Sequence, residues 1–192
     1  MTTDQLYEEL NFVSHSRENR LKYANLIIAN PGLYPKLLDI LFMVDDKISC
    51  RAGWIFEFAC RENLEAAIPF LDQFTSNLEK VHLDSAVRPV AKICEYLVMA
   101  YYAKRDNAIK LALTPEYQEH IIAACFDWMI NDEKIAPKAY SMNCLFLLGR
   151  DHDWIHPELE LILERDFQMQ SSGFKARARQ VITKIKNAKN NV

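Results

Sequence analysis

The chain has 192 residues, and half of them are apolar, which is enough to build one domain with its own hydrophobic core. A net charge of −3, with about a quarter of the residues charged, excludes a disordered chain and a generally basic nucleic-acid-binding protein. Leu and Ala together number 40, whereas Val and Thr number 13 and Gly only 4. This composition favours an all-α fold over a sheet.

The N-terminus is acidic and polar, and the longest apolar run, residues 97–103, is far too short to span a bilayer. We therefore expect no secretory leader and no membrane association. The cysteines are odd in number and never form a C-x-x-C pair, which predicts reduced thiols in the core of a cytoplasmic protein. They are Cys50, Cys60, Cys94, Cys125 and Cys144.

Helical periodicity runs along nearly the whole chain. The first helices are expected over about residues 4–13 and 17–30, and they form an N-terminal capping pair, residues 1–30. Apolar side chains then recur with helical spacing in KLLDILFMV and in AVRPVAKICEYLVMAYY. No linker is long enough to separate domains, so residues 1–192 are expected to form a single domain with a short tail at 188–192.

Four segments between residues 31 and 187 share a polar or acidic opening, then a basic residue, then a strongly apolar helix. They are DDKISCRAGWIFEFA, LDSAVRPVAKICEYL, DEKIAPKAYSMNCLFLL and SSGFKARARQVITKI. Another helix with a proline near its start precedes each segment, at Pro35, Pro69, Pro115 and Pro157. Extra residues around YYAKRDNAIKLALT account for the longest interval between the copies.

This two-helix unit resembles the HEAT repeat, and the clearest copy of its second-helix motif is Asp84-Ser85-Ala86-Val87-Arg88. The resemblance covers roughly residues 31–187 as four degenerate repeats. It implies a short right-handed α-solenoid (an α-α superhelix of the HEAT or armadillo kind) with about five helix pairs. One pair cannot bury its own apolar face, so neighbouring pairs must stack.

The basic residue of each repeat has two interpretations. It can belong to a basic ladder for phosphates or acidic peptides, or to an internal ion-pair ladder with acidic residues of its own or a neighbouring repeat. The structural ladder is favoured because HEAT-like stacks commonly use the base in this way. Its predicted members are Asp46, Arg51, Asp84, Arg88, Glu133, Lys138 and Arg177.

The C-terminal stretch from residue 165 carries seven bases and one acid, so the rest of the chain is acidic. It is interpreted either as an anion-binding or nucleic-acid-binding surface, or as a soluble cap whose bases complement the helix dipole. The cap is favoured because no aromatic residue follows Phe174. Possible anion-binding residues are Lys175, Arg177, Arg179 and Lys184.

Aromatic and basic residues gather at the longest interval between repeats, where insertions in solenoids often form the binding face. Trp154, on a predicted loop, is a further candidate surface anchor. The expected protein-binding residues are Tyr96, Tyr101, Tyr102, Lys104, Arg105 and Trp154.

The sequence gives less support to catalysis or to metal and nucleotide binding. Asp151, His152, Asp153 and His156 lie close together, but Pro157 places His156 before a helix, and no further metal ligand is evident. The chain contains no phosphate-binding glycine loop, and no cysteine can be given a partner histidine. No catalytic residue, metal or cofactor is expected.

The last third of the chain also resembles short bacterial all-helical proteins, some of which carry the name adenylosuccinate lyase. The lyase loop reads S-S-x-M-P-x-K-x-N-P, and here Ser171-Ser172-Gly173-Phe174-Lys175 retains the two serines and, out of register, a lysine. The Met-Pro and Asn-Pro pairs are missing, so lyase activity is not expected.

The sequence therefore predicts a non-enzymatic scaffold or adaptor that binds a protein partner. The alternative is nucleic-acid binding, or a HEAT-like DNA glycosylase, through the basic C-terminal helix. A metal or small-molecule enzyme around residues 151–156 is a third hypothesis.

Overall fold

The computed structural model describes residues 1–189, which form eleven α-helices and three 3-10 segments without any β-strand. The all-α prediction is confirmed. The α-helices are α1 (Thr3–Leu10), α2 (Arg17–Ala29), α3 (Tyr34–Leu41), α4 (Lys47–Glu62), α5 (Leu71–Thr75), α6 (Asp84–Tyr101), α7 (Ala108–Ala112), α8 (Pro115–Ile130), α9 (Ile135–Leu148), α10 (Ile155–Asp166) and α11 (Ser172–Lys189). Most of the predicted tail, 188–192, lies outside the described residues.

Several helices begin at a residue whose side chain caps the first turn. Thr2 and Gln5 form a reciprocal capping box at α1, and Ser16 accepts the backbone N–H of Asn19 at α2. Thr114 caps α8, and Pro115 follows it at the first helical position, where a missing N–H is harmless. Local sequence thus fixes where these helices start.

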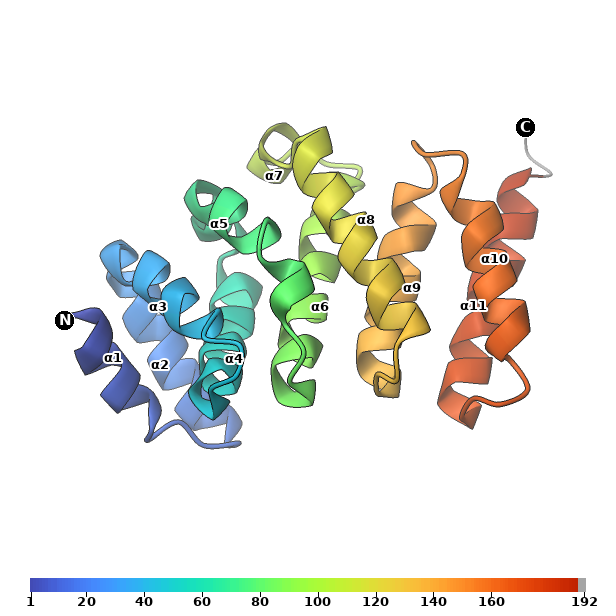
Figure 1. Cartoon of the computed structure of the whole chain (residues 1–192). Helices are drawn as coiled ribbons and strands as arrows, with labels where there is room; N and C mark the ends of the chain where they lie inside the picture. The colour runs from blue at the N-terminus through green and yellow to red at the C-terminus, as the bar shows by residue number, and fades with distance from the viewer. Residues whose placement is uncertain (190–192) are drawn as a thin grey trace.

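The helices stand side by side in a row, with the two chain termini at opposite ends (Figure 1). A first layer, nearer the viewer in Figure 1, consists of α1, α3, α5, α8 and α10. A second layer consists of α2, α4, α6, α9 and α11, and each of these helices contacts the next. Across the layers α3 packs on α4, α8 on α9 and α10 on α11.

The core lies between the two layers and is lined by the apolar stripes of the helices. Aromatic rings fill its N-terminal part, where Phe56 meets Tyr34 and Phe74 edge to face at 6.2 and 5.4 Å between ring centroids. All five cysteines are buried, so the prediction that they lie in the core is confirmed. In the described part of the chain, no helix is both long and apolar enough to cross a membrane.

The helix expected to begin near Pro69 is broken. Residues Leu64–Phe70 form a 3-10 segment that contains Pro69, and the short α5 and a further 3-10 turn, Leu78–Lys80, follow it. Proline lacks an N–H and clashes with the preceding turn, so an α-helix does not continue through it here. The extra residues of the longest interval form a loop and the short α7 rather than a longer helix.

A second proline lies inside α6 and orients a tryptophan of α4. Pro89 cannot donate to the carbonyl of Ser85, four residues earlier in the helix. The indole Nε1–H of Trp54 donates to that carbonyl instead, at 2.9 Å. Beside this bond a Cβ at Gly53 would come within 3.1 Å of Pro89, so the glycine allows α4 and α6 to approach closely.

Candidate functional site

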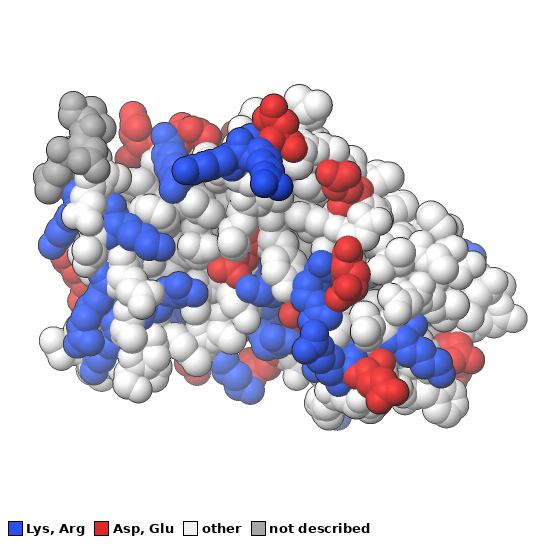
Figure 2. Space-filling model, turned by 180° about the vertical axis from the view of Figure 1, so that it is seen from behind, with Lys and Arg blue, Asp and Glu red and all other residues white. Residues whose placement is uncertain are grey.

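The two layers carry opposite charge. The helices of the second layer contain fifteen Lys and Arg against five Asp and Glu, whereas those of the first layer contain two against twelve. Seen from the side of the second layer, basic side chains follow the row of helices, with acidic side chains beside several of them (Figure 2). We call this surface the basic face.

Many cations of the basic face lie over aromatic rings. Arg20 of α2 and Arg61 of α4 both contact the ring of Phe58, at 4.6 and 4.3 Å from its centroid. Further along the row, Arg150 and Lys184 both lie over Phe146, at 5.6 and 5.4 Å. Such contacts hold the cationic groups in place while leaving their charge available.

A buried acid ties the centre of the face together. Glu95, which is 4% exposed, accepts hydrogen bonds from Lys92 at 2.6 Å and from Asn143 of α9 at 3.0 Å. Lys92 also lies over the rings of Tyr96 and Tyr140, at 4.9 and 4.6 Å. Through Glu95, Lys92 and Asn143, this group links α6 to α9.

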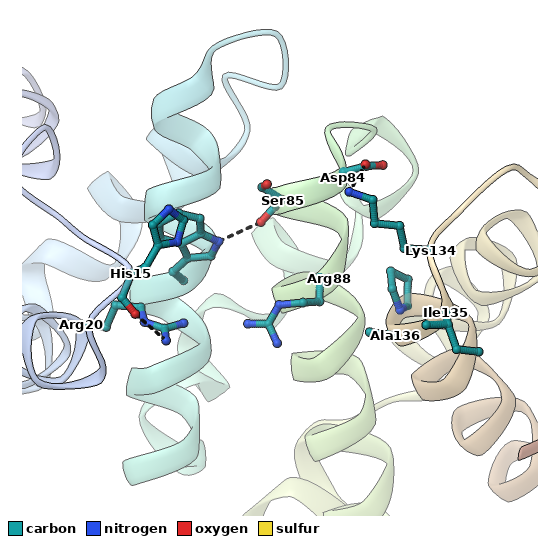
Figure 3. Close-up of a pocket in the computed structure, with 10 residues that line it drawn as sticks. His15, Arg20, Asp84, Ser85, Arg88, Lys134, Ile135 and Ala136 are labelled. Atoms are coloured by element: carbon teal, nitrogen blue, oxygen red, sulfur yellow. Dashed lines mark hydrogen bonds and ion pairs between the residues drawn. The ribbon is translucent and has the colours of Figure 1, made fainter. Parts of the chain in front are cut away.

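A pocket of about 540 Å³ opens between the ends of α4, α6 and α9. Arg20 of α2 and Arg88 of α6 reach into it from opposite sides, with their guanidinium groups directed toward each other (Figure 3). Arg88 pairs at 2.7 Å with Glu57 of α4, whose side chain is 10% exposed. Burial raises the pKa of Glu57, and Arg88 and Arg20 oppose that rise.

The upper wall of this pocket is aromatic. His15 and Trp54 lie ring to ring, 4.8 Å apart and tilted by 43°. Asp84 also lines the pocket and forms an ion pair at 2.7 Å with Lys134, just before α9. The pocket therefore combines two convergent arginines with an aromatic wall.

The predicted aromatic–basic patch is only partly brought together. Tyr101 and Tyr102 meet edge to face at 4.9 Å, and Tyr102 donates to Asp151 at 2.7 Å, which holds the pKa of the phenol well above its usual value. Both rings are half-buried. Burial is the first cause of that pKa rise and the bond to Asp151 the second, so this phenol is engaged inside the fold.

The other members of the predicted patch occupy different neighbourhoods. Lys104 and Arg105 are exposed in the loop before α7. Tyr96 lies under Lys92 on the basic face. Trp154 is 53% exposed and stacks on Phe126 of the first layer, with 5.5 Å between ring centroids.

The predicted ion-pair ladder forms only in part. Arg51 donates to the backbone carbonyls of Leu10 and Asn11 at the end of α1. Asp46 instead caps α4 through the N–H of Ile48.

In the next copies of the motif, Arg88 pairs with Glu57 and Asp84 with Lys134. These acids are contributed by the adjacent helix of the second layer rather than by the base's own segment. Lys138 is 3% exposed. Burial raises the pKa of Glu133, and the positive charge of Lys138 opposes that rise. The bond to Arg165 lowers the pKa of Asp166, and Lys138 adds to that effect. Arg177 is half-buried on α11.

The four possible anion-binding residues of α11 divide between two sides of the helix. Lys175 donates to the carbonyl of Gln168, and Arg179, one turn later, lies 5.1 Å from the ring centroid of Phe167. Lys184 extends instead over Phe146 on the basic face. Arg177 lies two helical turns before Lys184 and shares its side of the helix.

The remaining candidates have structural contacts. Nε2 of His156 lies 2.9 Å from the carbonyl of Phe146, and Ser171 accepts the N–H of Phe174 at the start of α11. Among residues 1–189, no three metal-ligating side chains come together. Arg20, Glu57 and Tyr140 were missed by sequence reasoning. Only the helical i, i+3 and i, i+4 spacing of Lys92 with Glu95 and Tyr96 signalled part of this face.

Comparison of the chain with protein-family models, with curated proteins and with solved structures found no match.

Proposed function

We propose that this protein is a non-enzymatic HEAT-like scaffold that binds an acidic protein partner on its basic face. The observation that carries the proposal is the segregation of charge between the layers, fifteen bases against five acids on one side and two against twelve on the other. A surface of one sign attracts and orients a partner of the opposite sign, even when the net charge of the molecule is small.

The order of the helices supports the HEAT-like part of the proposal. Five units, each with one element in the first layer and one in the second, follow one another along the chain, and the second-layer helices contact their neighbours. A right-handed cytoplasmic solenoid of five pairs would present its second layer as a continuous concave surface, as in other helical-repeat scaffolds.

A protein is preferred to a single-stranded nucleic acid as the partner because of how the aromatic rings are used. Phe58, Tyr96, Tyr140 and Phe146 are each covered by a Lys or Arg side chain. Bases of a single strand bind chiefly by stacking on open rings. Rings that already carry cations favour carboxylates, which pair with the cations directly.

The direct test measures fluorescence anisotropy with a labelled polyglutamate peptide. The double variant Arg150→Glu/Lys184→Glu reverses two exposed charges of the basic face, and Glu116→Lys/Glu119→Lys is a matched reversal on α8. We expect the first variant to weaken peptide binding about tenfold or more, and the second to leave it unchanged or slightly stronger. Equal binding by both variants would contradict the proposal.

Capture from the source cell's lysate then identifies the natural partner. Wild-type protein and the α8 variant should retain the same nuclease-resistant proteins, and the basic-face variant should lose them. Retention that nuclease abolishes would instead support the nucleic-acid alternative.

That alternative rests on α11, whose sequence has six Lys and Arg and no acid. Asp84 beside Trp54 also has the composition expected of a base-excision site, although Lys134 pairs with the carboxylate. Titration of a DNA duplex at several salt concentrations distinguishes the two functions. Phosphate contacts would give a steep fall of affinity with salt, whereas no measurable duplex binding would remove the alternative.

A further inference from the structure

The pocket at the N-terminal part of the basic face holds more positive than negative charge. Burial raises the pKa of the Glu57 carboxyl, and the positive charges of Arg88, Arg20, Lys92 and Arg61 oppose that rise. Burial lowers the pKa of Arg20, and the positive charges of Arg88 and Arg61 lower it further. Arg61 pairs with Glu62 at 2.8 Å, so Glu57 is left to the guanidinium groups of Arg20 and Arg88, and an added anion would relieve their mutual repulsion.

The two nearest guanidinium groups are not fully used by the protein. Arg20 donates through one terminal nitrogen to the carbonyl of His15 at 3.0 Å, while its buried Nε has no hydrogen-bond partner among residues 1–189. Arg88 pairs with Glu57 through one terminal nitrogen. Each guanidinium carries five N–H donors, so donors remain on both sides of the pocket.

The directions in which Arg20 and Arg88 enter the pocket favour an anion of a particular shape. Arg20 and Arg88 enter from α2 and α6 and point toward each other (Figure 3). A planar carboxylate matches a single fork, whereas a tetrahedral phosphate presents oxygens to two opposed forks at once. The nearby carboxylate of Asp84 is paired with Lys134, which reduces its repulsion of an anion.

The rest of the pocket suits the organic group of a phosphate ester. The His15–Trp54 pair forms an aromatic wall against which an organic group can pack. Helices α6 and α9 begin at the pocket, and in the described chain no side chain caps the first turn of either. Their free N–H groups add to the positive potential. A volume of about 540 Å³ lies within the range of small-molecule sites.

We propose that this pocket binds a phosphate monoester, with the phosphate held between Arg20 and Arg88 and the organic group against Trp54. The site is independent of the proposed acidic partner, whose test changes residues at the other end of the basic face. Two sources share this chemistry, namely a small phosphorylated metabolite and a phosphorylated side chain of a protein.

Isothermal titration calorimetry in low-salt buffer tests the site with inorganic phosphate, adenosine monophosphate and a phosphoserine peptide. We expect Arg20→Gln to weaken binding of all three probes about tenfold or more, because it removes charged donors. The matched control is Arg17→Gln, an exposed arginine on the same helix, which should leave the affinity unchanged.

A second variant is expected to bind phosphate more tightly, a result that loss of folding cannot produce. Glu57→Gln removes the carboxylate that pairs with Arg88, and we expect phosphate to bind about threefold or more tightly to this variant. Circular dichroism establishes that each variant is folded. Failure of all three probes to bind the wild type, or equal affinity in Arg20→Gln and Glu57→Gln, would overturn the proposal.

The same titrations identify the source of the phosphate. Tighter binding of adenosine monophosphate than of inorganic phosphate supports a small metabolite whose ring packs on Trp54. Tighter binding of the phosphoserine peptide supports a phosphorylated protein. In either case Arg20→Gln should weaken binding of the preferred probe as well as of inorganic phosphate.

Discussion

At Gly149 the end of α9 passes so close to the ring of His156 that there is no room for a Cβ atom. The imidazole cannot easily move away, because it stacks on Phe146 at 5.6 Å and one of its nitrogens lies 2.9 Å from the carbonyl of that residue. The glycine is therefore required by packing rather than by an unusual backbone angle, since its φ is −64°.

Replacing Gly149 with alanine should lower the free energy of unfolding by about 1–3 kcal/mol, the usual cost of overpacking. Urea unfolding followed by circular dichroism measures the change. Gly32→Ala is the control, because a Cβ there would meet no atom within 4 Å. Equal stability of the two variants would show that His156 can move aside.

Asp46 provides a prediction about pH. The carboxylate accepts the N–H of Ile48 at 2.9 Å and the hydroxyl of Tyr7 at 2.7 Å, and these bonds hold its pKa below the usual value. Since the folded state prefers the charged form, the stabilisation is complete above the ordinary Asp pKa and is lost as pH falls through the lowered one.

The variant Asp46→Asn should consequently be less stable than the wild type at pH 7, and the gap should narrow as the pH falls below about 4. Urea unfolding of both proteins at pH 7, 5 and 3.5 measures it. A gap that stays constant over this range would mean that the carboxylate charge contributes nothing to the cap.

At the scale of helices, the packing of α6 against α9 depends on the buried charge of Glu95. Glu95 is held by Lys92 and by Asn143, and no more than 5% of its side chain is exposed. Removing one partner of such a pair leaves the other charge without compensation, which costs more than the pair itself contributes.

Lys92→Met should therefore destabilise the protein by about 2–4 kcal/mol, and the double variant Lys92→Met/Glu95→Leu should recover most of that loss. Thermal and urea unfolding provide the measurement. Lys110→Met, which breaks the exposed pair with Asp106, should change the stability by less than about 1 kcal/mol. A double variant as unstable as Lys92→Met would argue against the charge as the cause.

The sequence predicted the helices well because their start signals are local. The expected helix over 17–30 is observed as Arg17–Ala29, where Ser16 caps the first turn. The broken element around Pro69 was not predicted, since the choice between a helix with a proline at its start and a 3-10 segment depends on packing against α3 and α4.

The pocket was not predicted because its members are far apart in the chain. Arg20, Glu57 and Arg88 lie on three helices, and no motif links them in the sequence. The repeated basic residue was identified at Arg88 and a partner in its own or a neighbouring repeat was expected, but Glu57 was not among the acids predicted for the ladder. Spacing along one helix indicates neighbours on that helix, whereas contacts between layers depend on how the helices pack.

At the scale of the whole molecule, the charge is polarised between two surfaces although the net charge is only −3. A flat charged resin contacts one surface at a time, so retention depends on that surface rather than on the total. Neutral pH lies above the sequence pI of about 6.0, and a protein with evenly spread charge would pass through a cation exchanger.

We expect the wild-type protein to be retained on a cation exchanger at pH 7 and low salt. The triple variant Arg177→Glu/Arg179→Glu/Lys184→Glu should flow through, because it reverses charges of α11. Reversal of three glutamates of α10 is the control and should strengthen retention. Flow-through of the wild type would show that the positive surface is too dispersed to act as a unit.

The missing N–H of Pro89 has a consequence for how this protein can change over generations. Because Ser85 keeps a free carbonyl only while residue 89 is proline, the position of the Trp54 indole depends on a residue 35 places further along the chain. A change to alanine at position 89 would let the helix reclaim that carbonyl, and Trp54 would lose its acceptor. We therefore expect Trp54 and Pro89 to be retained or replaced together, because the position of the indole in the pocket wall depends on the proline.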